Sequence, residues 1–121
     1  GRFGVHVDAT SQQWVGVIYL NLPEQCQGGT SLFRHKGLGL DRTPQTDKEL
    51  NDYGATSILD LLEKDGNDPS KWEHLMMVPM RFNRLVIYRP WMWHAPAEPF
   101  GNSIENGRLM QLMSFATQGP T

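Results

Sequence analysis

Alternating apolar and polar residues along most of the chain predict short β-strands. Such alternation, or a short run of β-branched and aromatic residues, is typical of strands that bury one or both faces. The clearest runs are residues 14–22 and 84–88, which are rich in Val, Ile and Tyr. The full set of predicted strands comprises residues 3–8, 14–22, 30–35, 72–82, 84–88, 91–94 and 108–115.

The middle of the chain has the only strongly helical pattern. Residues 56–64 predict a helix that stops at Gly66-Asn67. Its expected apolar side consists of Ile58, Leu59, Leu61 and Leu62. Residues 47–53 predict one or two further helical turns. About seven strands with one helical insertion are typical of an antiparallel sandwich or jelly roll, so we expect a mainly β fold.

Length and charge narrow the classes of protein and partner. The 121 residues predict a single domain, and the net charge of -2 comes without any Lys/Arg run. We therefore expect no nucleic-acid partner and no membrane association, because no apolar stretch approaches the roughly 20 residues of a membrane span. The single Cys26 is expected in a loop and fits a reducing, cytoplasmic location.

The first candidate for chemistry is a metal site. His6-Val7-Asp8 places an imidazole and a carboxylate two residues apart, which on a strand point to the same face. His94 comes after the strong predicted strand of residues 84–88, at the end of residues 91–94, and is the best third ligand. Two His and one carboxylate suit non-haem iron(II), although manganese accepts similar ligands; zinc more often takes three His or Cys ligands. Because this motif begins at residue 6, we expect the chain to be part of a longer protein.

The other two histidines are expected to be structural. His35 stands between Arg34 and Lys36, which disfavours a cation and predicts a solvated strand end. His74 lies in a run of Trp, Glu, Leu and Met residues.

Arg108 and Tyr19 are the candidates for binding an anion. Arg108 begins the last predicted strand, and a planar guanidinium suits a carboxylate in bidentate fashion. An exposed Arg at the start of a strand is the alternative interpretation. The Tyr19 hydroxyl could donate to the same carboxylate, or the ring could simply belong to the core. Trp91 and Trp93 precede His94 by three residues and one residue, and they could line a substrate channel or pack in the core.

In order and spacing these pieces resemble the prolyl-4-hydroxylase-like group of iron(II)/2-oxoglutarate-dependent oxygenases. The resemblance runs from residue 3 to about residue 115. It is carried by His6-Val7-Asp8, Tyr19-Leu20-Asn21, Gly28-Gly29, Phe82-Asn83-Arg84-Leu85-Val86, His94 and Arg108.

The resemblance implies a double-stranded β-helix, a variant of the jelly roll. It implies that His6, Asp8 and His94 hold Fe(II), that Arg108 pairs with the distal carboxylate of 2-oxoglutarate with help from Tyr19, and that Gly28-Gly29 starts the next strand. Dioxygen and 2-oxoglutarate would be co-substrates, with succinate and carbon dioxide as products. Asp8 favours hydroxylation, because related halogenases carry a small residue at that position. Small-molecule and peptidyl substrates both remain open.

The chain also departs from the group's pattern. The usual N-terminal strand and helices are expected to be missing, and Met110 stands where many members have a small polar residue. The helical insertion is longer than the group's short connections, so it could form a lid or a partner surface.

Two other functions remain open. One is a non-catalytic or partner-dependent jelly-roll metal-binding module, in which an exposed sheet edge would allow a homodimer. The other is a cupin-like enzyme that uses manganese or zinc, although the usual two close His followed by Glu are not seen.

Overall fold

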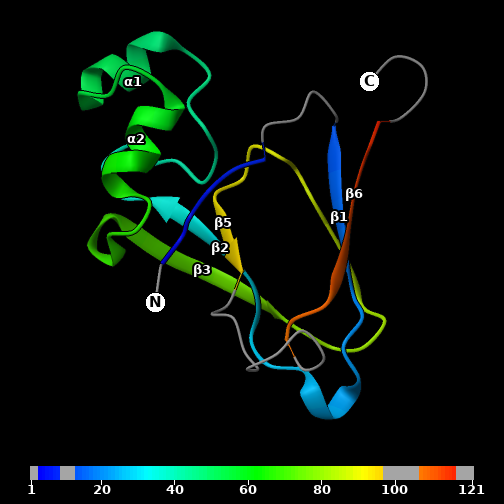
Figure 1. The fold of residues 1–121 in the computed structure, drawn as a ribbon. Helices are drawn as coiled ribbons and strands as arrows, with labels where there is room; N and C mark the ends of the chain where they lie inside the picture. Colours follow the sequence, from blue (N-terminus) through cyan, green and yellow to red (C-terminus); the bar gives the residue numbers. More distant parts are fainter. Residues whose placement is uncertain (1–2, 9–12, 97–106, 117–121) are drawn as a thin grey trace.

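Two three-stranded antiparallel sheets form the framework of the molecule, and two helices lie beside one of them (Figure 1). The computed structural model describes residues 3–8, 13–96 and 107–116. One sheet has the order β4-β1-β6 and the other has the order β3-β2-β5. The strands are β1 (Trp14–Tyr19), β2 (Gly29–His35), β3 (Trp72–Pro79), β4 (Leu85–Tyr88), β5 (His94–Pro96) and β6 (Met110–Phe115). The helices are α1 (Asp47–Tyr53) and α2 (Ile58–Asp65), with 3-10 turns η1 (Pro23–Gln25) and η2 (Pro69–Lys71).

The mainly β class with a helical insertion is confirmed, but three predicted strands differ clearly. Residues 3–8 form only an isolated bridge, in which His6 pairs with His94. The strand predicted over residues 91–94 begins instead at His94, because the Met92 N–H donates to the Arg89 carbonyl oxygen in a turn (3.1 Å). The last strand begins at Met110 rather than at Arg108.

The first sheet turns one face toward the second sheet. Val15, Val17 and Tyr19 of β1 are all buried, and they pack with Tyr88 of β4. On the opposite face Leu85 and Ile87 of β4 are about half exposed. These are the alternating sides expected of a strand with period two.

The second sheet carries a row of residues that reaches the predicted metal ligands. Leu32 of β2 is the Cα partner of Met76 on one side and of His94 on the other. His94 in turn pairs with His6. Directly opposite residues of an antiparallel pair share a face, so these four side chains lie on one face of the sheet. That face turns toward β1, because Thr30, two residues before Leu32, hydrogen-bonds Tyr19 of β1 through their hydroxyl groups.

The helices pack against the other face of the β3-β2-β5 sheet (Figure 1). Each helix begins after a hydroxyl N-cap residue, Thr46 for α1 and Ser57 for α2. Each hydroxyl oxygen accepts a hydrogen bond from a backbone N–H of the first helical turn, which stabilises the start of the helix. Leu61 of α2 is fully buried, but Leu59 is 68% exposed, so the expected apolar side of this helix was wrong at Leu59. No helix in the described part of the chain is long and apolar enough to cross a membrane.

Candidate metal centre and its surroundings

His6, Asp8 and His94 converge as the sequence predicts. One potential ligand atom from each lies within 4.8 Å of the other two. Two hydrogen bonds fix the histidines side by side: the His6 N–H donates to the His94 carbonyl (2.9 Å), and the His94 N–H donates to the His6 carbonyl (3.0 Å). Asp8 follows two residues later on the same side, and its N–H donates to the Pro90 carbonyl (3.0 Å).

Both histidines present the same ring nitrogen to this cluster. Nδ1 of His6 lies 3.0 Å from the Gly4 carbonyl oxygen, and Nδ1 of His94 lies 2.8 Å from the Met92 carbonyl oxygen. A carbonyl oxygen only accepts, so Nδ1 carries the hydrogen in both rings. In the neutral rings the Nε2 lone pairs are then available, which is the arrangement that backbone carbonyls impose on metal-binding histidines.

The charge state of the cluster also fits a metal ion. Burial lowers the pKa of His94; the hydrogen bond to the Met92 carbonyl opposes this, His6 adds a smaller lowering effect, and Asp8 raises the pKa least. His94 is therefore neutral at pH 7, so its Nε2 approaches Asp8 Oδ2 at 3.4 Å without forming an ion pair. Oδ2 is buried and accepts no hydrogen bond from the described residues. Nε2 of His94 and Oδ2 of Asp8 both carry lone pairs and face each other, which favours a cation bound between them. Their separation of 3.4 Å is close to the roughly 3 Å between two ligand atoms that each bind an ion at about 2.1 Å.

The segment that carries His6 and Asp8 is held on its other side by the end of α2. The Val5 N–H donates to the Gly66 carbonyl oxygen (3.0 Å). The Gly4 N–H donates to Oδ1 of Asn67 (2.8 Å). Gly66 is tightly enclosed, since a Cβ there would lie 2.5 Å from the Leu62 carbonyl oxygen. The helical insertion thus contributes directly to the placement of two predicted ligands.

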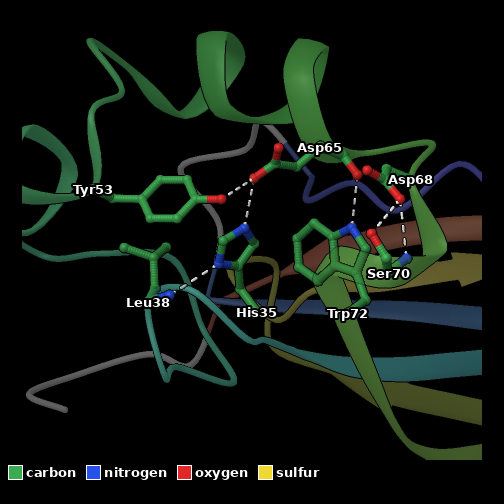
Figure 2. Close-up of polar contacts among 7 residues, drawn as sticks. All are labelled: His35, Leu38, Tyr53, Asp65, Asp68, Ser70 and Trp72. Carbon is green, nitrogen blue, oxygen red and sulfur yellow. Dashed lines mark hydrogen bonds and ion pairs between the residues drawn. The ribbon is translucent and has the colours of Figure 1, made fainter.

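A buried polar network anchors this end of α2 (Figure 2). Oδ2 of Asp65 accepts hydrogen bonds from Nε2 of His35 (2.8 Å) and from the Tyr53 hydroxyl (2.6 Å). The Asp65 carbonyl accepts from Nε1 of Trp72 (2.8 Å). The Leu38 N–H donates to Nδ1 of His35 (3.0 Å), so Nε2 carries the hydrogen of the neutral ring. The network joins α1, α2, β2 and β3.

The prediction that His35 is a solvated strand end was wrong, although its structural role is confirmed. His35 is fully buried and its ring packs against Trp72 and Tyr53. The charged neighbours Arg34 and Lys36 misled the prediction, because side chains alternate along a strand and His35 points to the opposite face. His74 is exposed and hydrogen-bonds Oγ of Ser31 at 3.0 Å.

Alkaline pH is expected to weaken the fold through Tyr53. Burial raises the pKa of Tyr53 to about 12, and the hydrogen bond and charge of Asp65 add to the rise. The phenol of the unfolded chain titrates near 10. The stabilisation is therefore complete below pH 10 and is lost as the pH rises through about 12. Urea unfolding of Tyr53→Phe should show a shallower loss of stability over this interval than the wild type, and equal slopes would contradict this assignment.

Tyr19 and Arg108, the predicted anion-binding pair, form a second polar group. The Tyr19 hydroxyl hydrogen-bonds that of Thr30 in the interior. Nη1 of Arg108 lies 3.3 Å from Sδ of Met80, which packs with Tyr19, and Nη2 donates to the Gln27 carbonyl (3.1 Å). Burial lowers the pKa of Arg108, and Tyr19 and Cys26 oppose this shift. The guanidinium is therefore partly withdrawn from water and lies near Tyr19.

Asn21 places Arg108. Nδ2 of Asn21 donates to the Gly107 carbonyl (2.7 Å), and Oδ1 accepts from the Leu109 N–H (2.6 Å). The buried amide thus holds the backbone on both sides of Arg108, where β6 has not yet begun. Of the Gly28-Gly29 pair, Gly29 begins β2 as expected, and a Cβ at Gly29 would collide with the Val78 carbonyl oxygen.

Tyr88 lies between the metal cluster and the Tyr19–Arg108 group. Its ring centroid is 4.7 Å from that of His94. Burial raises the pKa of Tyr88 above its usual value, and Asp8 and Tyr19 add to the rise. Asp8 of the metal cluster and Tyr19 of the anion-binding pair therefore both raise the pKa of the Tyr88 hydroxyl. Tyr88 remains protonated throughout the physiological pH range.

A comparison with family models matches residues 4–115, which include all five predicted site residues. The chain belongs to DUF6445, a family of unknown function. Comparisons with curated proteins and with solved structures give no match.

In this DUF6445 chain the two tryptophans near His94 have different places. Trp93 is fully buried and packs against Trp72 (ring centroids 5.1 Å apart), so it belongs to the core. Trp91 is 41% exposed. Cys26 follows η1, and its Sγ donates to the Leu22 carbonyl (3.5 Å). Residues 97–106, which precede Arg108, lie outside the described residues.

Sequence reasoning missed several residues that build this DUF6445 site: Thr30, Asn67, Tyr88 and the role of Asn21. A buried Asn next to a strand end and a Tyr at the end of an apolar strand were the available signals. Neither signal indicates its partner, because each partner lies far away in the chain.

Proposed function

We propose that this chain is an iron(II)- and 2-oxoglutarate-dependent dioxygenase that hydroxylates its substrate. The observation that carries the proposal is the convergence of His6, Asp8 and His94, with both imidazoles presenting Nε2. Two neutral histidines and one carboxylate leave coordination positions open, as oxygen-activating iron sites require. Iron(II) bound there would supply the site for activating dioxygen at the expense of 2-oxoglutarate.

The path of the chain supports a jelly roll of the double-stranded β-helix type. Residues 3–8 lie beside β5 of the β3-β2-β5 sheet, β1 lies in the β4-β1-β6 sheet, and β2 and β3 lie in the β3-β2-β5 sheet again. β4, β5 and β6 then alternate between the sheets. This repeated crossing places the predicted ligands and the predicted anion-binding residues on the facing sides of two sheets.

Arg108 and Tyr19 would bind the distal carboxylate of 2-oxoglutarate. A guanidinium partly withdrawn from water attracts a carboxylate more strongly than an exposed one does. Two of its acceptors are the uncharged Gln27 carbonyl and the Met80 sulfur, and an anion would outcompete both. Tyr19 would turn its hydroxyl from Thr30 toward the same carboxylate. Tyr88 is protonated and interacts with Asp8, so its hydroxyl would keep the Asp8 carboxylate oriented.

The proposal is tested by anaerobic addition of iron(II) and then 2-oxoglutarate. We expect a weak visible charge-transfer band, and slow succinate formation once air is admitted. Arg108→Ala should lose the band at the same 2-oxoglutarate concentration. The matched control is Arg84→Ala, because that guanidinium also donates to a carbonyl, Pro79 O (2.9 Å), but lies at the surface.

A missing band together with no succinate would contradict the oxygenase proposal. Metal binding that 2-oxoglutarate does not change would instead favour the metal-binding module or the cupin-like enzyme.

Asn67→Ala is expected to weaken iron(II) binding by roughly tenfold, as the loss of other groups that orient metal ligands does. The change removes the acceptor for the Gly4 N–H, next to the segment that carries His6 and Asp8. Asn67→Asp keeps an oxygen acceptor and should retain most of the affinity. Anaerobic titration calorimetry of both variants measures the difference. Equal losses in the two variants would contradict a role for this hydrogen bond.

A further inference from the structure

A cavity of about 370 Å³ lies between the two sheets, beside the candidate metal centre. Leu32, Met76 and Tyr88 line it. Leu32 is the direct neighbour of His94 across the β2–β5 pair, and the Tyr88 ring lies 4.7 Å from the His94 ring. The cavity and the metal cluster therefore share a wall. Its volume is within the range of about 300–1,000 Å³ that is typical of small-molecule sites.

The walls of this cavity favour an apolar occupant. Side chains from β2, β3 and β4 supply most of its surface, including Leu32, Met76, Val78 and Val86. The hydroxyl of Thr30, which also lines it, hydrogen-bonds Tyr19. Met76 is 51% exposed, so an apolar side chain also stands where the cavity meets solvent. Burying an alkyl or aromatic group here would gain roughly 25 cal/mol for each Å² removed from water.

A single charged residue, Arg89, stands among the described residues that line the cavity. Its guanidinium carbon lies 3.5 Å from the centroid of the Trp14 ring, and Nη1 donates to the Gln13 carbonyl (3.2 Å). The Trp91 ring is 5.2 Å away. Stacking between indoles fixes the plane of a guanidinium, and a fixed plane suits a carboxylate. The cavity thus combines apolar walls with one oriented cation.

We propose that this cavity holds the substrate of the enzyme, an apolar molecule that bears a single carboxylate. The carboxylate pairs with Arg89, and the apolar part extends along Leu32, Val78 and Val86. This inference rests on the proposed function for its chemistry. One substrate C–H group, one dioxygen and one 2-oxoglutarate give one C–OH group, one succinate and one carbon dioxide. 2-Oxoglutarate and the substrate C–H group each supply two of the four electrons that reduce dioxygen, and one oxygen atom enters each organic product.

Binding is tested first, without metal or 2-oxoglutarate. The probe is octanoate, and octan-1-ol is the neutral control. Binding of each is measured through the fluorescence of the tryptophans, because Trp14 lines the cavity. We expect octanoate to bind about tenfold more tightly than octan-1-ol, as a charge-assisted contact allows. Arg89→Gln should remove this preference and Arg89→Lys should retain part of it.

A second pair of variants keeps the test independent of the Trp14 stack. Met76→Glu places a like charge at the cavity and should weaken octanoate binding. Met77→Glu is the matched control, because Met77 is 42% exposed and lines a different cavity. No octanoate binding, no preference over octan-1-ol, or equal effects of the two glutamates would overturn the proposal.

Turnover is tested with iron(II), 2-oxoglutarate and air. We expect octanoate to accelerate succinate formation and to gain one oxygen atom by mass spectrometry. Octanoate that binds in the cavity of a protein that decarboxylates 2-oxoglutarate, yet changes neither quantity, would overturn its assignment as a substrate site. A protein that forms no succinate under any condition contradicts the proposed function instead, and the binding experiment then decides whether the cavity takes a carboxylate.

Discussion

His94→Ala is expected to lower the affinity for iron(II) by at least about 100-fold and to abolish 2-oxoglutarate decarboxylation. His94 is 3% exposed and supplies the predicted ligand that lies deepest in the molecule. Its removal leaves His6 and Asp8 alone on a segment that pairs with β5 at a single bridge. Losing a direct ligand should cost more than the 10–100-fold that is typical for groups behind the ligands.

The measurement is anaerobic titration calorimetry with iron(II), followed by a succinate assay in air. His74→Ala is the matched control, because His74 is an exposed histidine of the same sheet whose ring hydrogen-bonds Ser31 and packs against Phe33. Thermal unfolding establishes that both variants are folded. Wild-type affinity in folded His94→Ala would exclude the proposed metal centre.

Asp65→Ala is expected to lower the free energy of unfolding by about 3 kcal/mol. The change leaves a buried donor, Nε2 of His35, and a partly buried donor, the Tyr53 hydroxyl, without their common acceptor, and each such loss costs about 1–3 kcal/mol. Urea unfolding near neutral pH measures the loss. Asp68→Ala is the control, since Asp68 caps η2 at the surface in the same turn. A loss for Asp65→Ala no larger than for Asp68→Ala would show that the buried network contributes little.

A double variant separates the two donors. If Asp65 acts as their common acceptor, Tyr53→Phe in the Asp65→Ala background should cost much less than Tyr53→Phe alone. Additive losses would contradict this coupling.

The sequence predicted the parts of the site whose information is local. Period two brings His6 and Asp8 to one side, and the strong apolar pattern of residues 84–88 places β4 almost to the residue. Element ends were predicted less well. The turn around Arg89 to Met92 and the Asn21 amide near Arg108 replace strand hydrogen bonds with other contacts, which alternation does not reveal.

The alternation of apolar and polar residues could not predict hydrogen bonds between residues that lie far apart in the chain. His35 and Asp65 are 30 residues apart, and Gly4 and Asn67 are 63 residues apart. Neither pair has a sequence signature, because a histidine on a strand and an asparagine after a helix each suit many environments. The resemblance supplied the order of the five site residues, and the structure brings three of them together around one point.

The bridge between His6 and His94 has a consequence for the lifetime of the protein. An ion bound by these two residues and Asp8 would cross-link the chain and close a loop that contains most of both sheets and both helices. Ligands that bind only the folded chain raise its stability with their free concentration, by about 2.7 kcal/mol at 100 times the dissociation constant. Metal starvation would then expose the chain to proteases as well as stop turnover, so the supply of the ion would govern how much protein a cell retains.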